Sequence, residues 1–402
     1  MENMSAATMD AELLRLNDAK AELMTPVVAF LSVLMSCGVL GNVMVCCFYG
    51  SRARRSSHGT FISTVAMYDL IICGLSIPME IVDLRLFYTF TNVAACKAGR
   101  FINHFGAIGS VHVLLVIAVD RYRRICKPVK KQLSLKQAKI ACACSLLVSV
   151  FFSWPSILFY TPVAVDVKND FGLNITGHDC TTTRDTSFNM YISVFNYVYM
   201  TCFISYTFVL CVMYTLVGRV IVKHNKTRKS LIKKQESSTS KLTSLETSLS
   251  NGDQNISSSI PGKYRKIDAD RLKNTQTRPR TRTISTTTDR RKSTLSETQE
   301  IKNLNFSVIM LTITGLFVLS FLPFLVLSIW RAVNGEYEPD VLSDAKLVAF
   351  QFGLRSYFLN SALNPFVYGV LNSKFRSFVY RCFCGCSSKI DNLHAPSTSD
   401  AS

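Results

Sequence analysis

The chain has 402 residues, of which 48% are hydrophobic and 26 are phenylalanine, with a mean hydropathy of +0.22 and a formal net charge of +18. The chain is this apolar although it carries a long tract of Ser, Thr, Lys and Arg. Such a composition argues against a soluble protein. Nucleic-acid binding is disfavoured as well, since the basic residues gather in alternate loops and not on one face or one helix.

Seven apolar blocks are long enough to cross a bilayer, because a helix needs about 20 apolar residues to span about 30 Å of hydrocarbon. In chain order they are roughly 25–49, 61–86, 99–120, 138–160, 189–217, 304–330 and 346–370. We therefore predict an all-α membrane protein whose residues 25–372 form a seven-transmembrane helix bundle. Residues 223–302, between the fifth and sixth blocks, are poor in aromatics and are expected to form a disordered loop.

Lys and Arg crowd the loops after the first, third and fifth blocks and the segment after the seventh, whereas the other loops are acidic or mixed. Because positively charged loops stay in the cytoplasm, we predict a plasma membrane protein with an extracellular tail at 1–24 and a cytoplasmic tail at 387–402. The sequons at Asn3 and Asn174 then lie outside, where they can be glycosylated. Ser293 follows three basic residues, a pattern typical of kinase targets, although an unmodified tract is the alternative.

Two of the 14 cysteines, Cys96 and Cys180, fall in segments expected on the extracellular side. The oxidising exterior makes them natural disulfide partners, which would tie the loop before the fifth span to the top of the third.

The segment 373–386 has the pattern of a short amphipathic helix that lies on the membrane surface in contact with lipid. Phe375, Phe378 and Val379 fall on one face at helical spacing, opposite Lys and Arg. The predicted acylation sites are Cys382, Cys384 and Cys386. Free thiols are the alternative, and a metal site is disfavoured because the spacing is tight and no histidine is near.

Two motifs close apolar blocks at the predicted cytoplasmic side, Asp120-Arg121-Tyr122 after the third and Asn364-Pro365-Phe366-Val367-Tyr368 in the seventh. Charged groups at the edge of a span are costly unless they face a bundle interior, a cavity or a partner. With seven spans and the outer cysteine pair, these motifs resemble those of the rhodopsin-like (class A) G protein-coupled receptors over roughly residues 25–385. The resemblance implies a heterotrimeric G protein as partner, together with arrestin and receptor kinases.

The resemblance also implies a switch at the inner face. Arg121 would rest against Asp120 in the idle state and then turn toward the G protein, supported by Tyr214 and Tyr368. Pro128 and Val129 would dock on the G protein. In the sixth span, Phe317, Phe321 and Pro323 match the trigger region. Two departures are Phe321, where the family usually has Trp, and Tyr206, where Pro is common. The alternative is that Arg121 only extends to the lipid headgroups.

Asp69 falls in the middle of the second span, where a lone carboxylate is costly. The resemblance implies a sodium ion held near Asp69, and oxygen ligands suit a small hard cation. A protonated Asp69 in a polar water network is the alternative. The residues that match this network are Asn42, Asp69, Ser110, Asn360, Ser361 and Asn364.

The expected ligand pocket is polar at its mouth. Asn103 stands where amine receptors carry Asp, which disfavours an amine ligand. The predicted pocket residues are Glu80, Asp83, Asn103, His104, Ala107, Phe321, Phe324, Ser328, Arg331, Gln351 and Arg355. Charges of both signs above an aromatic floor suit a peptide, so we predict a neuropeptide receptor. The alternatives are a small non-peptide ligand and purely interfacial charges.

A channel or transporter is a rival class, but we find no internal repeat and no paired broken spans. The motifs of metalloproteases, serine hydrolases and P-loop enzymes are missing too, so we expect no enzyme activity and no cofactor other than the sodium ion.

Overall fold

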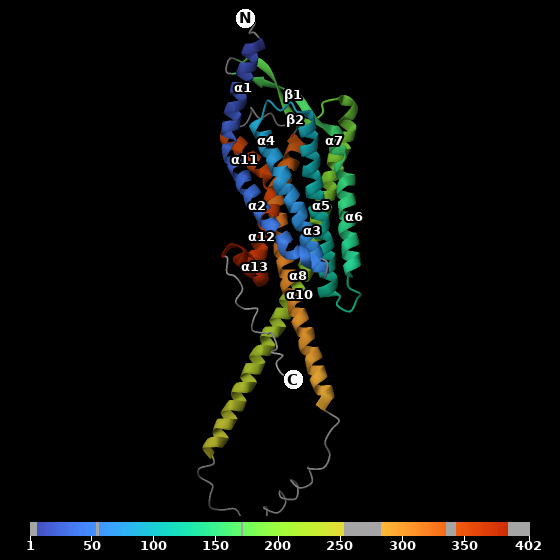
Figure 1. Cartoon of the computed structure of the whole chain (residues 1–402), viewed down its shortest axis with the longest axis vertical. Coiled ribbons are helices and arrows are strands. Elements are labelled where there is room, and N and C mark those ends of the chain that lie inside the picture. The colour runs from blue at the N-terminus through green and yellow to red at the C-terminus, as the bar shows by residue number, and fades with distance from the viewer. Residues whose placement is uncertain (1–5, 54–55, 170–171, 253–282, 335–342, 385–402) are drawn as a thin grey trace, which may run out of the picture. The chain divides into compact units, whose positions relative to one another are not determined.

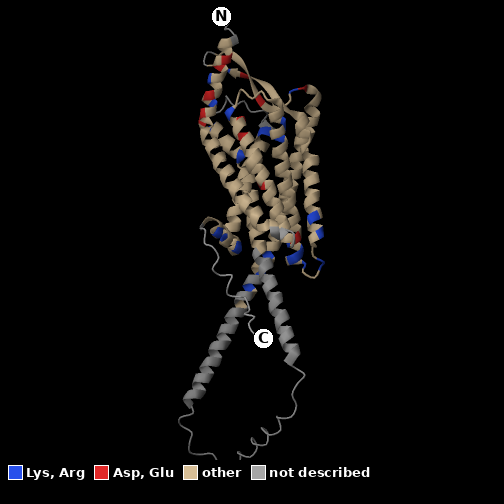
Figure 2. Ribbon diagram, in the orientation of Figure 1, with Lys and Arg blue, Asp and Glu red and all other residues tan. Residues whose placement is uncertain are grey.

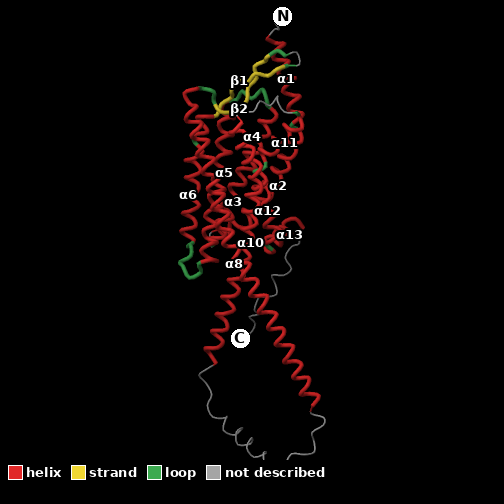
Figure 3. Tube along the Cα trace, turned by 180° about the vertical axis from the view of Figure 1, so that it is seen from behind, coloured by secondary structure: helices red, strands yellow, loops and turns green. Residues whose placement is uncertain are grey.

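The computed structural model describes residues 6–53, 56–169, 172–252, 283–334 and 343–384. It divides into two units, residues 1–214 with 307–402 and residues 215–306, which we describe separately. The first unit is a bundle of helices with the hairpin of β1 and β2 at one end, here called the hairpin end (Figures 1 and 3).

Six helical stretches of the described residues are long and apolar enough to span a membrane. The seventh predicted span consists of two shorter helices, α11 and α12, which meet at Ser356–Tyr357. The bounds are α1 Ala6–Leu23, α2 Thr25–Ala53, α3 Ser57–Ile71, α4 Ile77–Arg85, α5 Val93–Cys126, α6 Leu135–Ser153, α7 Pro155–Phe159, α8 Asn189–Gly252, α10 Thr283–Asn334, α11 Asp344–Arg355, α12 Phe358–Leu371 and α13 Ser373–Cys384. The predicted seven-helix bundle is confirmed.

Proline positions explain where some spans are interrupted. A π-helical turn, Ile72–Ser76, joins α3 to α4 just before Pro78, which has no N–H to donate to the preceding turn. Pro155 begins α7 after the end of α6. At these points the backbone changes direction within a continuous span.

The first and last spans pack closely because Gly41 has no side chain. A Cβ on Gly41 would lie 2.6 Å from Cβ of Pro365, closer than atoms can approach. The neighbouring Asn42 donates its amide N–H groups to the carbonyl oxygens of Gly38 and Ser361, both at 3.0 Å. This contact fixes α2 against α12, the helix that carries the Asn364-Pro365 motif.

The hairpin consists of β1, Tyr160–Lys168, and β2, Asn174–Thr182, which pair antiparallel with Pro162 opposite Cys180. The predicted disulfide between Cys96 and Cys180 is confirmed. It ties β2 to the start of α5, next to the buried Phe90. The hairpin is therefore held directly over this end of the bundle.

The structure differs from two expectations. The predicted extracellular tail is helical over Ala6–Leu23. The tract 223–302, expected to be disordered, is helical over 223–252 as part of α8 and over 283–302 as part of α10, while residues 253–282 lie outside the described residues. Residues 223–251 contain neither Gly nor Pro, the two residues that most disfavour a helix interior, so α8 can continue through them although they are rich in Ser and Thr.

Helix α1 is attached to the turn after α4 by one buried side chain, Asn17, which is 4% exposed. Its Oδ1 accepts hydrogen bonds from the backbone N–H of Tyr88 at 3.0 Å and the Thr89 hydroxyl at 3.3 Å. Its Nδ2 donates to the carbonyl oxygen of Arg85 at 3.1 Å. The first segment of the chain therefore packs as a helix against the hairpin end.

We expect Asn17→Ala to loosen α1, because leaving the buried partners of Asn17 unsatisfied costs about 1–3 kcal/mol. Backbone amide exchange over residues 6–23 should become about 5- to 150-fold faster, as measured by hydrogen exchange with mass spectrometry. Asp18→Ala is the matched control, since Asp18 is the exposed neighbour on the same helix. Equal exchange rates in both variants would mean that Asn17 does not hold α1 in place.

Candidate functional site

Four charged side chains form a compact cluster at the hairpin end, which we call the four-charge cluster: Glu80 and Asp83 of α4, Arg100 of α5 and Arg355 of α11. Glu80 lies 3.0 Å from both Arg100 and Arg355. Asp83 lies 3.1 Å from Arg100 and 3.5 Å from Arg355. The cluster thereby joins three spans that are far apart in the sequence.

Further polar contacts satisfy the cluster. Asn103 donates to Glu80 at 2.6 Å, and Arg100 donates to the carbonyl oxygen of Cys180 at 2.9 Å. Asp179 of β2 faces the cluster, where burial raises the pKa of its carboxyl and the nearby Arg100 guanidinium offsets part of that rise. Glu80 is 5% and Arg355 6% exposed, so removing either charge would leave the buried cluster with an uncompensated charge.

The structure brings together Glu80, Asp83, Asn103 and Arg355 from the predicted pocket, and Arg355 also donates to Gln351. Sequence reasoning missed Arg100, although its place one helical turn after the disulfide cysteine Cys96 was a usable signal. His104 of the predicted pocket adjoins the cluster, since its Nδ1 lies 2.7 Å from the carbonyl oxygen of Arg100 and its ring packs on Tyr199. The remaining predicted residues are Ala107 and Phe321, which line a deeper cavity; Phe324 and Ser328, half-buried on α10; and the exposed Arg331.

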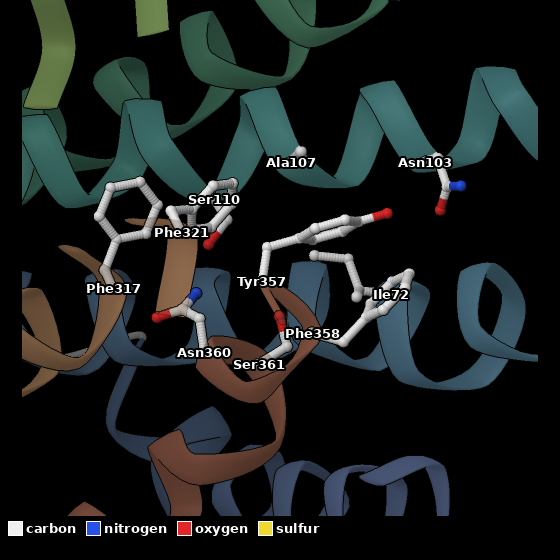
Figure 4. A pocket seen from close by; sticks show the side chains of 10 residues that line it. All are labelled: Ile72, Asn103, Ala107, Ser110, Phe317, Phe321, Tyr357, Phe358, Asn360 and Ser361. Atoms are coloured by element: carbon white, nitrogen blue, oxygen red, sulfur yellow. The ribbon is translucent and has the colours of Figure 1, made fainter. Parts of the chain in front are cut away.

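Below the cluster lies a small cavity, of about 10 Å³, between α5, α10, α12 and the π-helical turn (Figure 4). Phe321 packs against Phe317 with 4.5 Å between ring centroids and against Tyr357 at 5.5 Å. The hydroxyl of Tyr357 is directed toward Asn103 in Figure 4. Tyr357, which the sequence motifs did not single out, therefore connects the mouth to the predicted trigger. Pro323 lies inside α10 and is exposed.

The predicted polar network meets in the core of the bundle. Asp69 is fully buried and accepts a hydrogen bond from Asn364 at 2.8 Å. Oδ1 of Asp69, Oγ of Ser110, and Oδ1 of Asn360 and Asn364 are buried without a hydrogen-bond partner in the described part of the chain. Ser361 is buried close to Asp69. Unpartnered oxygen atoms are the donor type that a hard cation needs, so the residues present fit a sodium ion.

A second charge cluster occupies the opposite end of the bundle. Arg121 and Asp120 are both fully buried and paired with each other. Nε of Arg124 lies 3.0 Å from both carboxylate oxygens of Asp120, and Nη2 of Arg121 lies 2.9 Å from Nδ1 of His58. Sequence reasoning found Asp120 and Arg121 but missed Arg124, which lies one helical turn after Asp120 on α5. It also missed His58, because only the tertiary structure brings α3 against this part of α5.

The remaining switch residues are placed around this cluster. Tyr214 and Tyr368 are buried, and Tyr214 interacts electrostatically with Arg121. Tyr122 instead turns outward and lies under the ammonium group of Lys127, 5.4 Å from the ring centroid. Pro128 and Val129 are exposed, Val129 fully so at 99%. The structure thus separates a buried part of the switch from an exposed apolar loop.

The predicted surface helix is α13, whose Phe375 is buried against Phe48 and Tyr368. Two candidate modification sites, Cys382 and Asn174, are exposed. Four others cannot be placed: Asn3 and Cys386 lie outside the described residues, and so do the side chains of Cys384 and Ser293.

Charge is distributed unevenly along the bundle. Most Asp and Glu residues lie toward the hairpin end, whereas the opposite end is mainly basic (Figure 2). With the membrane-length helices and the two buried charge clusters, these features define a multi-pass membrane protein of the seven-helix receptor class. Residues 41–368 match the 7 transmembrane receptor (rhodopsin family), and the chain belongs to this family.

The individual relatives share 21% to 30% sequence identity with the chain. The chain is 28% identical over 132 residues to the human protein named probable G-protein coupled receptor 19, which covers 33% of this chain and 32% of that one. It is 21% identical to the Xenopus laevis cholecystokinin receptor over 88% of this chain and 76% of that receptor. It is 30% identical to the [Phe13]-bombesin receptor of Bombina orientalis over 32% and 33% of the two chains. The chain thus matches about a third of the length of the human relative.

Proposed function

We propose that this protein is a receptor that binds an extracellular ligand at the hairpin end and activates heterotrimeric G proteins at the opposite end. The observation that carries the proposal is the pair of buried charge clusters at the two ends of one bundle, each joining more than one helix. Buried ion pairs have discrete arrangements, so they suit an element that switches between two states.

The mechanism is a shift between two arrangements of the bundle. The ligand binds one arrangement better and raises its population. In that arrangement the sixth span, α10, moves outward about Pro323 and opens a cleft beside Arg121, Tyr214 and Tyr368. By linkage, a bound G protein must raise the affinity for the ligand by the same factor.

The orientation follows from the charges. The basic end faces the cytoplasm, which puts α1 and the hairpin outside, in a plasma membrane protein. On this orientation Asn3 and Asn174 carry glycans, and Cys382, Cys384 and Cys386 carry acyl chains that hold α13 at the lipid surface. Arrestin and receptor kinases then act on the cytoplasmic face, with Ser293 as one phosphorylation site. A sodium ion at Asp69, held by the buried Ser and Asn oxygens, would neutralise its charge.

The ligand that we propose is a peptide. In the four-charge cluster two carboxylates balance two guanidinium groups. A ligand that binds the carboxylates must therefore also neutralise the charge left on the guanidinium groups, and the reverse. A peptide with charged side chains or a polar end group can do so, whereas a simple amine cannot. Two relatives bear the names of cholecystokinin and bombesin receptors. A small non-peptide ligand is the second candidate, because the cavity beneath the cluster is lined mainly by aromatic and apolar side chains.

A screen of a neuropeptide library against cells expressing the full chain, with calcium and cAMP readouts, tests this function. We expect at least one peptide to trigger a response that depends on G protein. A response to small amines but to no peptide would contradict the ligand class. Ligand-driven ion flux in liposomes, without recruitment of G protein, would contradict the receptor itself and favour a channel or transporter.

A further inference from the structure

The first turn of α3 contacts two arginines of α5 at the end of the bundle opposite the hairpin. Nδ1 of His58 lies 2.9 Å from Nη2 of Arg121, and Oγ of Ser57 accepts a hydrogen bond from Nη2 of Arg124 at 3.1 Å. Ser57 and Arg121 are buried and His58 is half-buried, so water has little access to these contacts. The two side chains therefore attach the start of α3 to the last turns of α5.

The direction of the hydrogen bond at His58 determines which ring nitrogen carries the proton. A guanidinium group has only N–H donors, so Nδ1 of His58 is the acceptor, and the proton of the neutral imidazole is on Nε2. An imidazolium would face the like charges of Arg121 and Arg124 and the positive end of the α3 dipole, since His58 is the second residue of that helix. The nearby carboxylate of Asp120 is already paired with both arginines. The ring of His58 therefore acts as a neutral acceptor.

This hydrogen bond differs from the ion pairs of Arg121 and Arg124 because it joins two helices. Asp120, Arg121 and Arg124 all belong to α5, so the ion pairs among them lie within a single helix. His58 belongs to α3, so its ring restrains the guanidinium group of Arg121 on the side of α5 that faces α3. An Arg121 side chain that turns into a cleft beside Tyr214 must break the hydrogen bond to His58.

We propose that His58 is a positioning residue that holds Arg121 in the idle arrangement, because its neutral ring accepts a hydrogen bond that Arg121 must break on turning toward the G protein. This inference rests on the receptor function proposed above. Removing the acceptor makes the turn of Arg121 less costly, which raises the population of the active arrangement in the absence of agonist. The apparent affinity for an agonist rises with that population, since the agonist binds the active arrangement better.

Two substitutions at His58 separate the role of the acceptor from that of the ring. His58→Ala removes the acceptor, and we expect recruitment of purified heterotrimeric G protein without agonist to rise about 10- to 100-fold, the effect of losing one hydrogen bond to a charged group. His58→Asn places its Oδ1 close to the position of Nδ1, so recruitment should return to the level of the parent chain. Thr64→Val, further along α3, is the control for general damage, because the Thr64 hydroxyl donates to the carbonyl oxygen of Thr60 in its own helix.

A second measurement tests the hydrogen bond without any G protein. The full chain is isotope-labelled at its histidine ring nitrogens and studied by NMR in nanodiscs, and the signals of His58 are identified by their absence in the His58→Asn variant. We expect an unprotonated Nδ1 and a protonated Nε2 in the parent chain. The Nδ1 signal should shift in the Arg121→Ala variant, because the donor to this nitrogen is then gone.

The two measurements distinguish a failure of this inference from a failure of the receptor function. Equal, measurable recruitment by the parent chain and His58→Ala would overturn the positioning role, and so would a rise in His58→Asn as large as that in His58→Ala. A protonated Nδ1 in the parent chain would overturn it whatever the recruitment shows. If no chain recruits G protein, the proposed function fails, and the NMR signals alone then decide whether His58 holds Arg121.

Discussion

A variant with Arg121→Ala should fold and reach the cell surface but recruit G protein about 10- to 100-fold less effectively than the parent chain. The loss corresponds to one charge-assisted hydrogen bond to the partner, worth about 1.5–3 kcal/mol. Folding should survive because Arg124 still neutralises Asp120, with its Nε 3.0 Å from both carboxylate oxygens. Surface labelling measures expression, and a G protein recruitment assay with the agonist found by screening measures coupling.

Arg123→Ala is the matched control. Arg123 lies on the same turns of α5 but donates to the carbonyl oxygen of Lys131, away from Asp120. The Arg123→Ala substitution removes one positive charge from the same end of the bundle. Because Arg123 does not contact Asp120, coupling should stay close to that of the parent chain. Full coupling by the Arg121→Ala variant would disprove the switch role and leave Arg121 as a structural residue.

The second large effect is expected at the four-charge cluster. Arg355→Met should lower the free energy of unfolding by about 3–5 kcal/mol, because it removes one partner of a buried ion pair and leaves Glu80 with excess negative charge. Thermal unfolding of the purified chain in nanodiscs measures this loss. Agonist affinity should fall as well, since the spans that form the mouth lose their common contact.

A double substitution separates the ion pair from general damage. Adding Glu80→Gln to Arg355→Met should recover part of the lost stability, with a coupling energy of about 0.5–3 kcal/mol between the two positions. Arg331→Met, a change at an exposed arginine toward the same end, should have little effect. Additive losses in the double variant would show that Glu80 and Arg355 do not stabilise each other.

Local properties of the sequence were enough to predict the spans and the motifs. The length of an apolar block determines whether a helix can cross the bilayer, and the lengths of the blocks predicted seven spans. In the structure the seventh span is divided between α11 and α12. Charge alternation between loops placed Cys96 and Cys180 on one side, and the disulfide followed. The sequence analysis singled out Asn42, and its neighbour Gly41 proved to be the point where α2 touches Pro365.

Contacts between distant segments were harder to anticipate. The sequence contains Arg100 and His58, but their partners Glu80 and Arg121 lie on other helices. Arg124, by contrast, stands four residues after Asp120, a spacing typical of an ion pair within one helix. Residues 1–24 were predicted only as an extracellular tail. A short polar helix has marginal stability by itself, so α1 depends on tertiary contacts such as those of Asn17. Residues 223–252 were predicted to be part of a disordered tract from their composition, whereas α8 continues through them in the structure.

The sequence by itself determined that this is a seven-helix membrane protein of the rhodopsin family, because hydrophobic length, loop charge and short motifs are properties of single segments. Only the tertiary structure decided which charges neutralise one another and which oxygens of the polar core remain without partners in the described part of the chain. The physical reason is that a buried charge or polar atom is tolerated according to its neighbours in space, and those neighbours come from helices far apart in the chain.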